Sequence, residues 1–224
     1  MDDDVLTDGS AVFNYRSYMN PRESKIKSLW PWAEPEDVPL RISISGVAGT
    51  GKRKLAKSLS RKLDIPAISG IPRTVGDMGG LLNKRADLSD EFMIFMAQFW
   101  EQQEYSEYVS AGSLIDLVAH IDYLFGQSTD LKNKSAAHAA ANVINMIASN
   151  AYTVYFYLPF RNKPKPDGVR SVDEKYLREI DRLTRFYLDA FDIDYFPLDG
   201  THSENSELAM SYMEDFSLLD DRDL

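Results

Sequence analysis

Residues 46 to 52 have the types and the spacing of a phosphate-binding loop. The segment reads Gly46-Val47-Ala48-Gly49-Thr50-Gly51-Lys52. Glycines let backbone N–H groups turn inward around a polyphosphate, the N-terminus of a following helix adds partial positive charge, and a lysine reaches the outer phosphates. The segment therefore predicts a site that binds the phosphates of a nucleotide.

The residue after the lysine departs from this motif. The motif has Ser or Thr there as a Mg²⁺ ligand, whereas this sequence has Arg53, whose guanidinium cannot ligate a cation. Three interpretations stay open: Mg²⁺ is held by water and another carboxylate, Arg53 itself supplies charge, or Arg53 faces solvent and the metal site is partly lost. The motif thus predicts phosphate binding more firmly than it predicts catalysis.

The loop is expected to join a strand to a helix, because an alternating apolar run precedes it and a helical pattern follows it. We predict strands at 41–45, 65–68, 108–111, 152–158 and 195–198. We predict helices at 52–63, 90–104, 114–125, 136–149, 172–191 and 204–213. Strands that alternate with helices predict an α/β fold, here a three-layer P-loop fold with a central parallel sheet of about five strands and helices on both faces.

The predicted helix at 90–104 carries five large apolar side chains on one stripe, which we interpret as core: Phe92, Phe95, Met96, Phe99 and Trp100. The segment after the second predicted strand is rich in glycine and is expected to be a mobile loop. By composition the chain divides into an N-terminal extension at 1–38, one α/β domain at 39–213 and an acidic C-terminal tail at 214–224. Aromatic residues of the extension are expected to pack on the domain, the alternative being an arm that binds a partner.

Composition excludes several classes of protein. The 224 residues include 35 acidic and 25 basic side chains, for a formal net charge of −10, which disfavours general binding to DNA without excluding a local basic site. Cysteine is absent, so disulfides and thiolate metal sites are excluded. The chain starts with acidic residues and has no apolar run that could cross a bilayer, so we expect no membrane partner and a cytoplasmic protein.

Further candidates follow the predicted strands, because ligands of parallel sheets bind beyond the carboxyl ends of the strands. Asp116 is a carboxylate near the loop, with a functional role and a helix-capping role equally favoured. Asp77 is a second acid, for which an ordinary turn is the favoured interpretation. The loop at 161–170 concentrates basic residues, and we favour a phosphate-closing role for it over a solvated loop. The three histidines have no metal-ligand spacing, and His120 is expected to be a packing residue.

The order of these segments resembles the small P-loop kinases of nucleosides and nucleotides. Ile71-Pro72-Arg73 follows the second predicted strand, and Asp167-Gly168-Val169-Arg170 precedes the long C-terminal helix. The chain is most similar to phage-type deoxynucleoside monophosphate kinases, phage kinases of 5-hydroxymethyluridine in DNA, and the ribosylnicotinamide kinase group. The resemblance covers about residues 40–200, and it implies a kinase-like domain at 39–213, ATP and Mg²⁺ as cofactors, and the host cytoplasm if the protein is viral.

The resemblance implies roles for the candidate residues. Residues 46–51, Lys52 and Arg53 would bind ATP, with Lys52 also catalytic. Arg170 would close from the lid as a catalytic residue, and Asp116 would be a catalytic acid and a possible metal ligand. The acceptor, a nucleotide or nucleoside, would be bound by four side chains: Arg73, Asp77, Arg161 and Lys163. A DNA acceptor is possible but not favoured by net charge, and a homodimer is left open.

One segment departs from the family. These kinases carry Asp-Arg-Ser where this sequence has Ala111, Gly112 and Ser113. An acid and an arginine of the catalytic site are therefore missing. The preferred prediction is an ATP-dependent phosphotransferase, and its rival is a catalytically degenerate nucleotide-binding module with a regulatory or assembly role. A third alternative is an ATPase that moves a partner. Such an enzyme needs an acid that activates water, and the sequence has Ala111 at the position where that acid is expected.

Overall fold

The computed structural model describes residues 39–126, 128–215 and 218–219. The interpretations of the N-terminal extension and of the last acidic residues lie outside these residues. No helix among the described residues is long and apolar enough to span a membrane.

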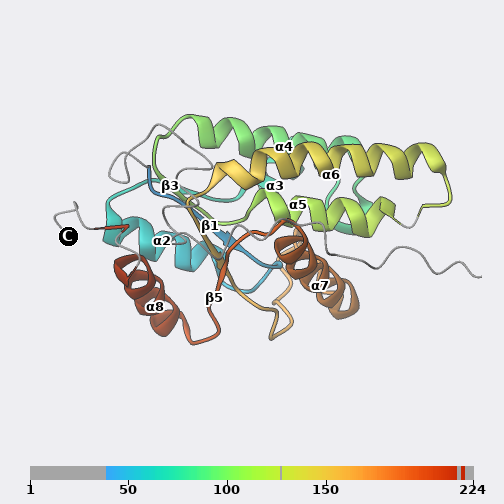
Figure 1. Cartoon of the computed structure of the whole chain (residues 1–224). Helices are drawn as coiled ribbons and strands as arrows, with labels where there is room; N and C mark the ends of the chain where they lie inside the picture. The colour runs from blue at the N-terminus through green and yellow to red at the C-terminus, as the bar shows by residue number, and fades with distance from the viewer. Residues whose placement is uncertain (1–38, 127, 216–217, 220–224) are drawn as a thin grey trace, which may run out of the picture. The chain divides into compact units, whose positions relative to one another are not determined.

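A five-stranded parallel sheet forms the centre of the fold, with the strand order β2-β3-β1-β4-β5 (Figure 1). The strands are β1 (Arg41–Ser45), β2 (Ala67–Ile68), β3 (Tyr108–Ser110), β4 (Val154–Tyr157) and β5 (Phe196–Pro197). Each lies within a predicted strand. β1 pairs with β3 on one side and with β4 on the other, so the loop that follows β1 lies at the middle of the carboxyl edge.

Seven α-helices flank the sheet in the described part of the chain. They are α2 (Lys52–Leu63), α3 (Ile71–Asp77), α4 (Leu88–Gln103), α5 (Leu114–Ile121), α6 (Leu131–Ala151), α7 (Glu174–Ala190) and α8 (His202–Asp215). Four of them begin after a side chain that accepts a backbone N–H of the first turn, as helix N-caps do: Asp87, Ser113, Asp130 and Asp173.

The helices form a layer on each face of the sheet (Figure 1). Ile42 and Ile44 of β1 pack with apolar side chains of α2 and α8. On the other face, Tyr155 and Tyr157 of β4 pack with apolar side chains of α4, α5 and α6. Alternate residues of a strand point to opposite faces, so a parallel sheet covered on both sides needs apolar residues at successive positions. The three-layer α/β fold predicted from the sequence is therefore confirmed.

The interpretation of the aromatic stripe on α4 was wrong in part. Phe95 is buried, but Phe92 and Trp100 are 55% and 59% exposed. The face of α4 that turns inward includes Ile94 and two polar residues, Glu91 and Gln98. Packing against the rest of the protein therefore buries a face of α4 that the positions of its aromatic residues alone do not indicate.

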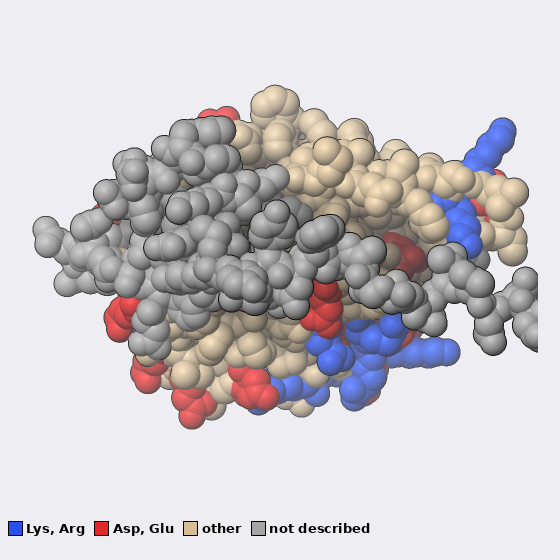
Figure 2. Space-filling view, in the orientation of Figure 1, with Lys and Arg blue, Asp and Glu red and all other residues tan. Residues whose placement is uncertain are grey.

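The neighbouring helix α6 also exposes apolar side chains, among them Val143 and Met146. Residues 135–151 of α6 contain no Asp, Glu, Lys or Arg. The upper surface in Figure 2 is accordingly mostly tan, and blue side chains gather at its right end.

Several boundaries also differ from the sequence predictions. Residues 71–77, expected in a mobile loop, form α3, and Pro72 lies in its first turn, where its missing N–H costs no helical hydrogen bond. The helix predicted to continue to residue 125 changes at Asp122 into a π-helix (Asp122–Gly126). At the C-terminus, α8 runs to Asp215, and Leu219 is buried against the core that α2 and α8 share.

Candidate nucleotide-binding site

The loop between β1 and α2 (residues 46–52, the phosphate loop) has the backbone shape that its glycines allow. Gly46 has φ +134°, and a Cβ there would lie 2.4 Å from the carbonyl oxygen of Leu158. Gly49 has φ +92°, and a Cβ there would lie 2.5 Å from the Cβ of Pro164. A side chain at either position would collide with a neighbouring loop, so the close approach of these loops requires glycine.

Lys52 folds back onto the phosphate loop. Its ammonium donates to the carbonyl oxygens of Gly46 and Val47, and it lies 3.9 Å from the carboxylate of Asp116. Burial lowers the pKa of Lys52, an effect that Asp116 opposes and that the charges of Arg170 and Arg53 reinforce. Its positive charge thus lies inside the loop, where the motif expects phosphates to bind.

Asp116 caps a helix, as one of the two interpretations from the sequence expected, and it also contacts the phosphate loop. Its carboxylate accepts the backbone N–H of Ser113 at 3.2 Å, and the Ser113 hydroxyl accepts the N–H of Asp116 at 3.0 Å, which together form a capping box at the start of α5. The same carboxylate accepts the N–H of Gly46 at 3.1 Å. Burial raises the pKa of Asp116, although Lys52 lowers it. The residue therefore links the N-terminus of α5 to the phosphate loop.

The lid loop (residues 161–170) lies against the phosphate loop, as shown by the contact between Pro164 and Gly49. Within it, Asp167 accepts a hydrogen bond from Arg170 at 2.9 Å and one from Arg73 of α3 at 2.8 Å. Backbone N–H groups of Arg170 and Val169 also bond to this carboxylate and lower its pKa to about 2. Arg73 and Arg170 are far apart in the sequence, and their hydrogen bonds to Asp167 bring them next to each other.

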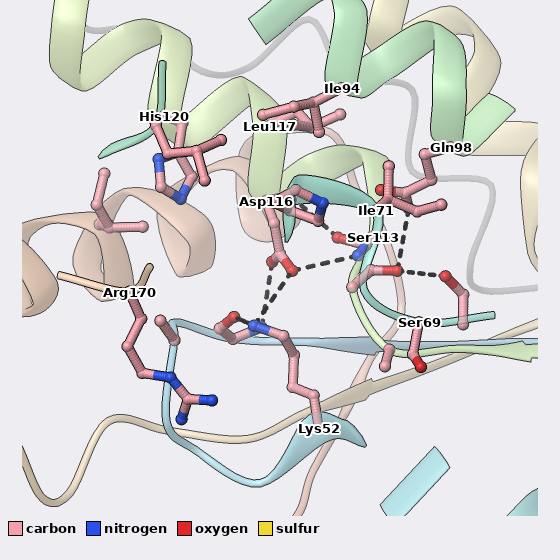
Figure 3. A pocket seen from close by; sticks show the side chains of 18 of the residues that line it. Lys52, Ser69, Ile71, Ile94, Gln98, Ser113, Asp116, Leu117, His120 and Arg170 are labelled. Atoms are coloured by element: carbon pink, nitrogen blue, oxygen red, sulfur yellow. Dashed lines mark hydrogen bonds and ion pairs between the residues drawn. The ribbon is translucent and has the colours of Figure 1, made fainter. Parts of the chain in front are cut away.

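A pocket of about 180 Å³ extends from the phosphate loop toward α3 and α4. Lys52 and Asp116 face each other at one end, and Arg170 enters from the side of the lid (Figure 3). Apolar side chains that include Ile71 and Ile94 form the other end (Figure 3). A pocket with a cationic end and an apolar end fits a ligand that joins an anionic group to a flat or apolar group.

Three candidate residues lie away from this pocket, and two more, Arg53 and Arg73, do not line it. Asp77 is exposed at the end of α3. Arg161 pairs with Asp199, and Lys163 is exposed in the lid loop. None of the three contributes to the lining of the pocket. Of the basic candidates in the loop at 161–170, Arg170 is therefore the one that lines the pocket together with Lys52.

The pocket is also lined by polar residues that were not among the candidates taken from the sequence, including Glu91, Gln98 and His120. Glu91 of α4 is 2% exposed, and burial raises its pKa to about 8, so it is protonated at neutral pH. The side-chain NH₂ of Gln98 donates to the carbonyl of Gly112 at 3.2 Å. His120, assigned only to packing, bonds Tyr176 at 2.9 Å and also lines the pocket. The sequence offers one signal for the two residues of α4, because a glutamine interrupts the apolar run 92–100 and Glu91 directly precedes that run.

The residues present do not form a usual Mg²⁺ site. The expected hydroxyl ligand is replaced by Arg53, and the hydroxyl of Thr50 donates to the carbonyl of Val47 at 3.0 Å. Asp116 already accepts two backbone N–H groups. Among the described residues, no three Asp, Glu or His side chains gather in a way that could hold a metal ion. The donor set therefore fits a directly ligated metal poorly.

Comparison with solved structures assigns the fold. The chain is similar to the deoxyadenosine kinase from M. mycoides with bound dATP, at 16% identity and a TM-score of 0.57, over 78% of this chain and 100% of that one. It is similar to the thymidylate kinase from Candida albicans, at 14% identity and a TM-score of 0.58, over 80% of this chain and 92% of that one. The fold is therefore that of the small P-loop nucleoside and nucleotide kinases.

A third similar structure is that of a longer protein. NadR in complex with NR matches at 12% identity with a TM-score of 0.63, over 80% of this chain and 51% of that one. This chain thus spans about half the length of that protein. The sequence matches no protein-family model and no curated protein.

Proposed function

We propose that the protein is an ATP-dependent phosphotransferase that acts on a nucleotide or nucleoside. The observation that carries the proposal is a continuous pocket that joins the phosphate loop to the apolar wall of α3 and α4. Lys52 and the backbone of the phosphate loop would bind the phosphates of ATP, and the apolar wall would bind the base of the acceptor. The fold shared with nucleoside and nucleotide kinases supports the same function.

The acceptor that fits best is a nucleoside monophosphate, as in the phage-type deoxynucleoside monophosphate kinases. A hydroxyl acceptor has to lose a proton during transfer, and this favours a nearby free carboxylate. Burial raises the pKa of Glu91 to about 8, which favours its protonated form at neutral pH, and Asp116 accepts hydrogen bonds from two backbone N–H groups. A phosphate acceptor is already ionised and needs no such base. A hydroxyl of hydroxymethyluridine in DNA is the next candidate, although the net charge of −10 disfavours a polyanion.

In the proposed reaction, an acceptor oxygen attacks the γ-phosphorus of ATP. The bond from that phosphorus to the bridging oxygen breaks, and the electron pair leaves with ADP. Lys52 and Arg170 neutralise charge on the transferred group, and Arg73 lies next to Arg170 at Asp167, where it would address the acceptor phosphate. The protein contributes position and charge, and no covalent enzyme intermediate forms.

A transfer assay with radiolabelled ATP tests the function. The acceptors are the deoxynucleoside monophosphates, nucleosides and DNA that contains hydroxymethyluridine. We expect transfer to at least one monophosphate, and a loss of at least about 100-fold in Lys52→Ala. Lys62→Ala is the control, because it removes the same charge at the exposed far end of α2. Transfer to no acceptor would contradict the proposal.

A nucleotide-binding module without catalysis is the second candidate. It is favoured by Ala111 and Gly112, which line the pocket after β3 where related kinases are expected to carry an acid and an arginine. Such a module would bind ATP with a Lys52-dependent affinity but would transfer phosphate to nothing. Binding and transfer measured on the same sample separate the two functions.

A further inference from the structure

The guanidinium of Arg53 lies beside the start of α3. Arg53 belongs to the first turn of α2, and one of its terminal nitrogens is 2.8 Å from the position that a Cβ of Gly70 would occupy. Gly70 has φ +93° and is the N-cap of α3. Its neighbours Ser69 and Ile71 line the pocket. The side chain of Arg53 thus extends from the end of the phosphate loop to Gly70, whose two neighbours line the pocket.

This guanidinium is available for a ligand. Arg53 is exposed, and among the described residues it has no hydrogen-bond acceptor and no carboxylate partner. The other arginines near the site are paired, since Arg73 and Arg170 both bind Asp167. Arg53 is also close enough to Lys52 for its charge to lower the pKa of that lysine. An arginine that has no partner in the described part of the chain, at the end of a phosphate loop and next to a second cation, favours an anionic ligand.

Arg53 also occupies the position from which a hydroxyl ligates a metal ion in this motif, and the remaining donors fit a directly ligated metal poorly. We propose that Arg53 supplies the charge that a protein-bound metal supplies elsewhere, by contacting the terminal phosphates of ATP. The inference rests on the proposed binding of ATP at the phosphate loop. Its consequence is that the protein binds ATP with little dependence on divalent cations.

The test is the affinity for ATP, measured by isothermal titration calorimetry in Mg²⁺ and again in EDTA. For the unmodified protein we expect the two dissociation constants to agree within about threefold. Arg53→Ser removes the guanidinium and restores the hydroxyl of the motif. In EDTA this variant is expected to bind ATP about 10- to 100-fold more weakly, because hydrogen bonds to charged groups contribute about 1.5–3 kcal/mol. Mg²⁺ should restore a large part of its affinity.

Two further variants sharpen the test. Lys54→Ser removes a positive charge one residue further along α2. The charge of Lys54 adds to the effect of burial in lowering the pKa of His202 of α8. This variant is expected to bind ATP like the unmodified protein. Arg53→Lys keeps the charge without the planar fork and should lose only part of the affinity in EDTA. Circular dichroism before each titration verifies that the variants are folded.

The outcomes separate this inference from the proposed function. If ATP binds in Mg²⁺ but Arg53→Ser shows the same ratio of the two dissociation constants as the unmodified protein, the role of Arg53 is refuted and ATP binding stands. A loss of the same size in Lys54→Ser would also refute it, because the effect would then be one of general charge. If no ATP binds under either condition, the proposed function itself fails.

Discussion

Arg73 and Arg170 share one carboxylate, although 97 positions separate them in the sequence. Asp167 holds both side chains, and its own pKa is lowered to about 2 by backbone hydrogen bonds from Arg170 and Val169. An arginine held by a carboxylate loses less conformational freedom when a phosphate arrives. At the scale of residues, the site therefore combines two arginines that Asp167 holds with Arg53, which has no partner among the described residues.

The role of Arg170 is expected to appear in turnover more than in binding. Arg170→Ala should lower kcat by about tenfold or more with a smaller change in the KM for ATP, because charge on the transferred group develops in the transition state. Arg161→Ala is the matched control in the same loop, since Arg161 pairs with Asp199 outside the pocket. Steady-state kinetics with varied ATP measure both constants. Equal losses in the two variants would assign the effect to the charge of the loop as a whole.

At the scale of elements, α4 has two apolar sides with different surroundings. Ile94 is 4% exposed and lies between the core and the pocket, whereas Trp100 is 59% exposed. Asp87 and Asp90 form a capping box that begins the helix. The helix is thus stabilised locally at its start and oriented by its contacts with α3 and α5.

Substitutions on the two sides of α4 should therefore differ in cost. Ile94→Ala removes buried methyl groups and is expected to lower the free energy of unfolding by about 2–5 kcal/mol. Trp100→Ala removes a larger side chain but should cost less than about 1 kcal/mol, because most of that side chain already contacts solvent. Urea denaturation followed by circular dichroism measures both values. A larger loss for Trp100→Ala would mean that its exposed face is covered in solution.

At the scale of the whole molecule, stability depends on pH because buried titratable groups have different pKa values in the folded and unfolded states. Burial raises the pKa of Glu91 from an ordinary value of 4.5 to about 8, with a smaller contribution from Asp90. Between these values the folded protein binds a proton that the unfolded chain releases. The contribution of Glu91 to the free energy of unfolding therefore falls as the pH rises from about 5 to 8.

Glu91→Gln should remove this contribution, because glutamine is neutral and has nearly the shape of a protonated glutamate. The variant is expected to gain more than about 1 kcal/mol of stability relative to the unmodified protein when the pH is raised from 5 to 8. Glu101→Gln, an exposed substitution on the same helix, should show no such gain. Chemical denaturation at both pH values measures the difference. An equal effect of Glu91→Gln at the two pH values would contradict the buried, protonated state.

The sequence by itself determined the phosphate loop, the order of the strands and of the helices other than α3, and hence the three-layer fold. These features depend on local spacing: glycines at set positions, periodic apolar residues, and the hydrophobic run at 152–158 that contains β4. They also account for the expectation that Lys52, Asp116 and Arg170 lie at one edge of the sheet, since the carboxyl ends of parallel strands meet there.

Only the tertiary structure decided which side of α4 faces the pocket, that Asp167 joins Arg73 to Arg170, and that Arg53 reaches Gly70. Each of these depends on contacts between segments distant in the chain, whose relative position is set by packing across the sheet. Aromatic residues on α4 fit either side of the helix by pattern, and the packed core selected the side with Glu91 and Gln98. Side-chain type and spacing therefore determine the chemistry available to this protein, and packing determines which of those groups meet.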